Sequence, residues 1–273
     1  MKIGIIDADN YERPAMFPNL SLMKIAAFHK SKGDNVEWYQ PLITGHCDRV
    51  YIAKVFSTEY TPGWHFPISA DEIVKGGSGF ALSTEGGREA YDKSKDPELP
   101  GEIEKMFPDY SIYQAKKAYG FLTRGCPRNC PFCHTTQMQG AKVKTVHEVG
   151  DFWNGQKEIV LLDPNITASA DFFRHVEELR KTGAWVNFSQ GLDARLLTKE
   201  KIEAINELKI RQLHIAWDNP KEDLSEHLER VKKNLKHNRR DNIVVYILTN
   251  YNSSHEEDMK RIKNARSLGS SLM

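Results

Sequence analysis

The chain contains one cysteine-rich stretch, Thr123-Arg124-Gly125-Cys126-Pro127-Arg128-Asn129-Cys130-Pro131-Phe132-Cys133-His134. Three of the four cysteines lie in it, spaced Cys-x3-Cys-x2-Cys, directly after an apolar run that has the composition of a β-strand. The fourth, Cys47, lies far upstream. Gaps of two and three residues let one curling loop aim three sulfurs at a single centre. The stretch therefore predicts a metal-binding loop at the end of a strand.

Thiolates are soft, anionic ligands that suit iron-sulfur clusters or zinc. Three close ligands with no fourth nearby leave one coordination position open. Pro127 and Pro131 restrict φ at their positions, which stiffens the loop before a metal arrives. Gly125 permits a tight exit from the preceding strand.

Two other interpretations of the cysteines remain. A structural zinc site would use Cys126, Cys130, Cys133 and His134, but the adjacent Cys133 and His134 have difficulty reaching one ion together. A disulfide framework is disfavoured because four cysteines in 273 residues are sparse, three of them are bunched, and no secretory segment precedes them.

The cysteine spacing, with the aromatic Phe132 just before the last cysteine, resembles the signature of the radical SAM superfamily. The resemblance implies that Cys126, Cys130 and Cys133 bind three irons of a [4Fe-4S] cluster, while the fourth iron binds S-adenosylmethionine (SAM). It implies an enzyme whose reduced cluster cleaves SAM to a 5′-deoxyadenosyl radical that abstracts a hydrogen atom. An electron donor such as flavodoxin or ferredoxin is then expected, and Cys47 is not expected to be a ligand.

Charge and hydropathy exclude several partners. The chain has 38 basic and 37 acidic residues, so its net charge of +1 gives no global field that attracts nucleic acid or an anionic membrane. No RNA-binding appendage is evident, and no apolar run approaches the roughly 20 residues that span a bilayer. The N-terminus has the pattern of a strand and not of a signal peptide. We expect a cytoplasmic protein.

The first part of the chain predicts an α/β unit, with strands over residues 2–6, 35–39 and 49–56. A helix is predicted from Ser21 as N-cap to Gly33 as its C-terminal glycine. The stretch Ser69-Ala70-Asp71-Glu72 has the form of a capping box and predicts a short helix. It leads to Gly76-Gly77-Ser78-Gly79, which favours a tight loop over a phosphate cradle.

This part, residues 1–80, resembles the Rossmann-like domain of the cobalamin-binding class of radical SAM enzymes. That class usually carries an Asp-x-His-x-x-Gly motif, and Asp7-Ala8-Asp9-Asn10 lacks the histidine. We therefore expect the fold without cobalamin. Residues 81–114 are rich in Gly, Pro and charge and are predicted to be a linker with short helical pieces.

Residues 115–273 alternate regularly between strand and helix patterns. Strands are predicted near residues 118, 158, 185, 212 and 243, with helix N-caps at Ser169 and Thr198, a C-terminal glycine at Gly183, and a last helix over about 256–268. Repeated strand-helix units predict an α/β fold with parallel strands. By resemblance this is a partial (β/α) TIM-type barrel of five to six units. The tail at 269–273 looks too short and polar for a sixth strand plus helix.

Polar loops follow each predicted barrel strand, where reactive groups gather in such folds. The resemblance implies that Asp163 and Asn165 take the place of a SAM-amino-binding element and that Arg195 clamps the SAM carboxylate. It also implies that Ser189 and Gln190 bind carboxylate or ribose, that Asp218 bonds a ribose hydroxyl, and that Phe132 packs near adenine. A helix cap or a loop hydrogen bond is the alternative for each. The substrate and any further catalytic residues are not indicated. A non-catalytic, metal-stabilised binding protein is the alternative function.

Overall fold

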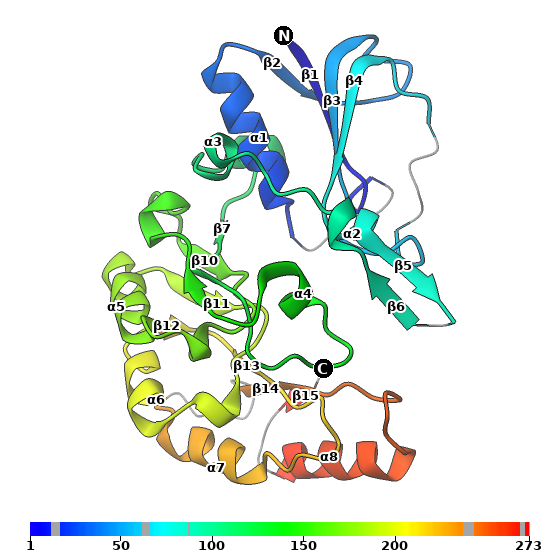
Figure 1. The fold of residues 1–273 in the computed structure, drawn as a ribbon. Helices are drawn as coiled ribbons and strands as arrows, with labels where there is room; N and C mark the ends of the chain where they lie inside the picture. Colours follow the sequence, from blue (N-terminus) through cyan, green and yellow to red (C-terminus); the bar gives the residue numbers. More distant parts are fainter. Residues whose placement is uncertain (12–16, 62–65, 87, 237–242, 268–270, 273) are drawn as a thin grey trace. The chain divides into compact units, whose positions relative to one another are not determined.

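A computed structural model of the chain describes residues 1–11, 17–61, 66–86, 88–236, 243–267 and 271–272 (Figure 1). The chain divides into two compact units, Met1–Ala115 and Lys116–Met273. Each unit has its own parallel sheet and its own buried apolar residues, so each is considered by itself. None of the described helices is long and apolar enough to cross a membrane.

The first unit is built on a parallel sheet of four strands in the order β2-β1-β3-β4. Its central strand β1 is almost entirely buried because neighbours cover both of its edges and apolar side chains cover its faces. The parallel sheet confirms the α/β unit that the sequence predicted, whereas the order of its strands was not predicted. The strands are β1 (Lys2–Asp7), β2 (Asn35–Trp38), β3 (Cys47–Ala53) and β4 (Ala70–Gly76).

Helix α1 (Leu20–Ser31) connects β1 to β2 and packs its apolar residues on the sheet. The predicted N-cap at Ser21 is wrong by two positions, because the Asn19 side chain accepts the hydrogen bond from the Leu22 amide at 3.1 Å. Gly33 follows the helix with φ of +80°, as a helix-terminating glycine requires.

The short helix predicted from the capping box at residues 69–72 is instead a strand, β4, so this prediction was wrong. The capping-box pattern is a local signal, whereas β3 offers backbone partners along the full length of β4, from Cys47 opposite Ala70 to Ala53 opposite Gly76. The glycines that follow form a tight turn into the short helix α2 (Ser78–Ala81). A Cβ at Gly77 would lie 2.3 Å from the Lys54 carbonyl oxygen, so only glycine fits there.

Residues 81–114, expected to be a linker, contain regular elements that belong to the first unit. Ile103 is buried in the same apolar cluster as Ile3 and Leu22, and the Trp38 indole donates to the Ile112 carbonyl at 3.0 Å. The elements are β5 (Leu82–Glu85), β6 (Arg88–Tyr91), η1 (Lys93–Lys95), α3 (Gly101–Glu104) and η2 (Tyr110–Tyr113).

The second unit contains two parallel sheets, with helices between strands that follow one another in the chain (Figure 1). One sheet has the order β12-β11-β10-β7 and the other the order β13-β14-β15. The short strands β12 and β13 follow one another in the chain, and an isolated parallel bridge links Leu192, in the loop after β11, to Ile215 of β13. The strands are β7 (Ala118–Gly120), β10 (Glu158–Leu161), β11 (Trp185–Phe188), β12 (Lys209–Ile210), β13 (Leu213–Ala216), β14 (Ile243–Tyr246) and β15 (Ser271–Leu272).

Four longer helices connect these strands, and successive helices pack side by side, as in a partial TIM-type barrel. Thr198 caps α6 and Gly183 ends α5 as predicted. Ser169 is not the N-cap of α5; its hydroxyl accepts from the Asp171 amide, and the helix begins one residue later. The helices are α5 (Phe172–Thr182), α6 (Lys199–Ile205), α7 (Ser225–Asn234) and α8 (His255–Ser267).

The end of the chain corrects another prediction. Ser271 and Leu272 pair in parallel with Val244 and Val245 of β14, so a two-residue strand is present in the tail, which was expected to be too short and polar for a further strand plus helix. Residues 268–270 and 273 lie outside the described residues. Pairing with a buried neighbouring strand stabilises even a two-residue strand, which the composition of the tail did not indicate.

Substitution of Gly120, at the end of β7, tests how closely side chains pack in the second unit. A Cβ there would lie 2.3 Å from the buried Phe152 ring, so Gly120→Ala is expected to lower the free energy of unfolding by about 1–3 kcal/mol. Urea unfolding measures this change. Gly150→Ala is the matched control because no atom lies within 4 Å of the added methyl. Equal stability of the two variants would contradict the packing.

Candidate functional site

The cysteine loop follows β7 and the short strand β8 (Thr123–Arg124), and helix α4 (Thr135–Gln139) closes it. The Cys126 amide donates to the Gly140 carbonyl at 3.1 Å, and the Gly125 amide donates to the Gln139 side chain at 3.1 Å. Gly125 has φ of +98°, and a Cβ there would lie 2.4 Å from the Lys142 carbonyl oxygen. The residue before the first cysteine must therefore be glycine.

All three cysteines of the loop are free thiols; Cys126 and Cys130 are half-buried and Cys133 is exposed. Burial raises the pKa of the Cys130 thiol, the neighbouring Cys133 and Cys126 raise it further, and Arg195 opposes the rise. Among the residues that the structure describes, no three His, Cys, Asp or Glu side chains are arranged as a metal site. The donor set itself, three neighbouring thiols on one loop, fits an iron-sulfur cluster by its chemistry.

His134, the fourth ligand of the alternative zinc site, has an imidazole Nδ1 that lies 3.1 Å from the Gln137 side-chain oxygen on α4. The adjacent Cys133 thiol donates instead to the Thr135 hydroxyl at 3.2 Å. The two neighbouring side chains thus contact different residues of α4.

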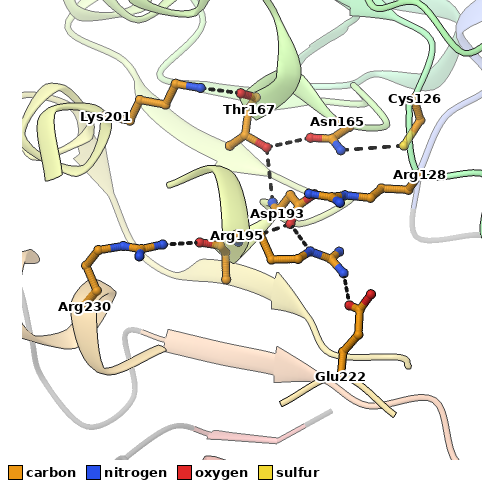
Figure 2. A network of polar contacts seen from close by, with 10 residues as sticks. Cys126, Arg128, Asn165, Thr167, Asp193, Arg195, Lys201, Glu222 and Arg230 are labelled. Atoms are coloured by element: carbon orange, nitrogen blue, oxygen red, sulfur yellow. Dashed lines mark hydrogen bonds and ion pairs between the residues drawn. The ribbon is translucent and has the colours of Figure 1, made fainter. Parts of the chain in front are cut away.

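Asn165 brings the loop after β10 to the cysteine loop (Figure 2). Its amide nitrogen donates to Cys126 Sγ at 3.6 Å, and its amide oxygen accepts from the Thr167 hydroxyl at 2.6 Å. Asn165 and Thr167 are both buried, at 4% and 0% exposure. That Asn165 contacts SAM stays a prediction. In this structure its side-chain amide forms hydrogen bonds with a sulfur and a hydroxyl.

Asp193, in the loop after β11, holds two arginines at once (Figure 2). One carboxylate oxygen accepts from Arg128 of the cysteine loop, and the other accepts from Arg195 Nε at 2.6 Å. Burial acts to raise the pKa of Asp193, but Arg195 and Arg128 outweigh it and hold the pKa below its usual value. Arg195 also pairs with Glu222, which follows β13. Loops after three strands are thus linked by one chain of ion pairs.

Asp163, the other residue predicted after the second barrel strand, is 4% exposed. Its two oxygens accept from the amide of Leu122, at 3.1 Å, and from the amide and hydroxyl of Thr123, at 2.5 and 2.6 Å. Burial raises its pKa to about 6 although these hydrogen bonds favour the ionised form. In this structure the carboxylate fixes the strand end from which the cysteine loop departs.

The remaining predicted site residues lie at the same ends of the strands. The Ser189 hydroxyl donates to the Leu161 carbonyl at 2.7 Å, and the exposed Gln190 amide donates to Ser189 at 3.5 Å. Burial raises the pKa of Asp218, which accepts from the Leu248 amide at 3.2 Å. The Phe132 ring meets the Tyr251 ring edge-on, with 5.4 Å between centroids, so the cysteine loop also contacts the loop after β14.

Sequence reasoning did not identify four residues of this network: Arg128, Thr167, Glu222 and Tyr251. Arg128 lies between the first two cysteines in the sequence, and a cation beside thiolates is a pattern from which it could have been predicted as a site residue. The other three carry no local signal, because their contacts join loops that are distant in the sequence.

The raised pKa of Asp163 makes stability depend on pH. Between about pH 4 and pH 6 the folded chain binds this proton more tightly than the unfolded chain, so the contribution of Asp163 to the free energy of unfolding falls as pH rises through that window. The fall is about 3 kcal/mol, and no further loss follows above it. Urea unfolding of wild type and Asp163→Asn from about pH 4 to pH 7 measures it. A difference between the two proteins that does not change with pH would contradict the assignment.

Comparison with known proteins bears on the family and the fold of the chain. Residues 121–270 match the profile of the radical SAM superfamily. A search of curated proteins finds no match. A matching solved structure is the radical S-adenosylmethionine methyltransferase TsrM from Kitasatospora setae, with cobalamin and a [4Fe-4S] cluster bound; the match has a TM-score of 0.66 at 10% identity and covers 99% of this chain and 74% of that one. At this identity the likeness shows the fold alone. Because the family profile matches more than half of the chain, including the cysteine loop and the strands from β10 through β14, the chain belongs to the radical SAM superfamily.

Proposed function

We propose that this chain is an enzyme that cleaves SAM reductively at a [4Fe-4S] cluster and abstracts a hydrogen atom from a substrate. The observation that carries the proposal is the loop of three free thiols at the carboxyl end of the first barrel strand, inside the region that matches the family. Cys126, Cys130 and Cys133 would hold the cluster. When bound, the cluster and SAM supply the one-electron chemistry that yields the 5′-deoxyadenosyl radical.

The residues around the loop supply charges that suit SAM. Arg195 is the candidate for its carboxylate, since a guanidinium binds a carboxylate through two parallel hydrogen bonds. In this structure Arg195 is already paired with Asp193 and Glu222, and Glu222 is the more exposed of the two, at 44% against 5% for their side chains. A SAM carboxylate would therefore replace Glu222 and leave the Asp193 contact in place.

Other contacts to SAM follow from exposure. Gln190 is exposed and Phe132 is half-buried, so part of each side chain is accessible to a nucleoside. Ser189 and Asp218 complete the proposed set at the neighbouring strand ends. Asp163 and Asn165 have their polar atoms engaged by the protein, and we assign them to support of the loops.

The electron required for cleavage would come from a small redox protein such as flavodoxin or ferredoxin. Cobalamin is not part of the proposal, although the TsrM structure contains it. The loop after β1 offers no histidine: Asp7 accepts from Asn10 and Tyr113, and Asp9 accepts from the Val55 amide and the Thr61 hydroxyl. The absence of cobalamin remains a prediction.

Cluster assembly tests the ligand assignment. After anaerobic reconstitution, wild type is expected to contain about four irons and about four sulfides per chain. Cys126→Ala, Cys130→Ala and Cys133→Ala are each expected to lose most of both, because each removes one of only three protein ligands. Cys47→Ala is the control, since Cys47 is buried in the first unit, and it should retain the full content. A full cluster in all three loop variants would refute the site.

SAM cleavage tests the activity itself. Anaerobic incubation of the reconstituted protein with SAM and dithionite is expected to release 5′-deoxyadenosine, which chromatography detects. Cys126→Ala serves as the matched inactive protein. A cluster-loaded wild type that produces no 5′-deoxyadenosine would favour the alternative in which the metal only stabilises a binding protein.

A further inference from the structure

The Asn165 amide is placed to act on the first cysteine of the loop. Its nitrogen lies 3.6 Å from Cys126 Sγ, within hydrogen-bond range for sulfur, and the residue is 4% exposed. Water therefore has little access to compete for this contact. A hydrogen bond made away from water and to a charged acceptor is stronger than an exposed one.

Thr167 decides which end of the Asn165 amide faces the sulfur (Figure 2). The Thr167 oxygen accepts from the Asp193 amide at 3.2 Å, so its single hydrogen is free to be donated to the Asn165 amide oxygen, 2.6 Å away. With its oxygen so engaged, the Asn165 amide presents its NH₂ group to Cys126. The hydrogen-bond chain thus orients a donor, and not an acceptor, toward the thiol.

Contacts from two other elements keep this chain in place. Lys201 of α6 donates to the Thr167 carbonyl at 2.6 Å. Asp193, whose amide donates to Thr167, is held by Arg128 and Arg195. Three strand-end loops and a helix therefore fix one amide group, which is more support than an ordinary loop hydrogen bond receives.

We infer that Asn165 donates a hydrogen bond to the Cys126 thiolate of the loaded protein and thereby raises the reduction potential of the cluster. The inference rests on the proposed function. Reduction adds one negative charge to the cluster and its sulfurs, so a donor to sulfur stabilises the reduced form more than the oxidised form. Asn165 acts through Cys126 and is a positioning residue; Thr167 sets the direction of its amide.

The experiment is an EPR-monitored redox titration of reconstituted protein in the absence of SAM. For Asn165→Ala, loss of a hydrogen bond to a charged group is expected to lower the ratio of reduced to oxidised cluster about tenfold at a fixed potential. This corresponds to a midpoint potential about 59 mV more negative for one electron. Asn165→Asp keeps the shape and the contact with Thr167 but replaces the donor with an oxygen, so its shift should be at least as large and in the same direction.

Asn206→Ala is the matched control for a lost buried amide. Asn206 is also a buried asparagine of the second unit, 8% exposed, but it bonds the Asn234 carbonyl and the Lys236 amide at the end of α7. Its substitution should leave the midpoint potential unchanged. If general loosening of the fold were the cause of a shift, this variant would show it as well.

The outcomes separate this inference from the proposed function. A wild type without a cluster would overturn the proposed function. A wild type with a cluster, together with Asn165 variants of unchanged potential, would overturn only the inference. An equal shift of the midpoint potential in Asn206→Ala would also overturn the inference. So would folded Asn165→Ala and Asn165→Asp proteins that both fail to assemble a cluster, since Asn165 would then be needed for cluster assembly and not for setting the reduction potential.

Discussion

A single buried carboxylate, Asp193, holds the candidate site together. It is 8% exposed and lies between two guanidinium groups, one from the cysteine loop and one from its own loop. A carboxylate in such surroundings is costly to bury alone, and paired arginines compensate for that cost. Because Arg195 continues to Glu222, the same contact aligns the ends of three strands. The cysteine loop is thus fixed by charge from one side and by Asn165 from another.

Further contacts, one set polar and one aromatic, link the loops that follow the strands. The buried Arg261 of α8 donates to the carbonyls of Trp217, Asp218 and Leu248, and so joins the ends of β13 and β14. Phe132 meets Tyr251 beyond β14. Apolar side chains determine the sheet, but hydrogen bonds and ion pairs determine where its loops lie. A site built on loops requires such support, because loops have few buried apolar contacts of their own.

Predictions from short sequence patterns were correct where the interactions that decide the structure lie within one segment. The strands at residues 118, 158, 185 and 243 were predicted from short apolar runs, and Thr198 and Gly183 were predicted from the preferences of helix ends. They failed where another segment supplied the hydrogen bonds. Residues 69–72 have a capping-box pattern, yet residues 70–72 begin β4, because β3 satisfies their backbone, and the tail gains a strand by pairing with β14.

The sequence by itself determined the position of the candidate site: three thiols at a spacing that one loop can direct to one centre, after a strand and before a run of α/β units. It did not determine which polar residues support those thiols. Asp163 and Asn165 were both candidates for the same SAM contact in the sequence, yet one accepts from the strand end and the other donates to Cys126. Only the tertiary structure decides this, because a hydrogen bond depends on distance and direction between loops, and neither is encoded in the spacing of residues along one loop.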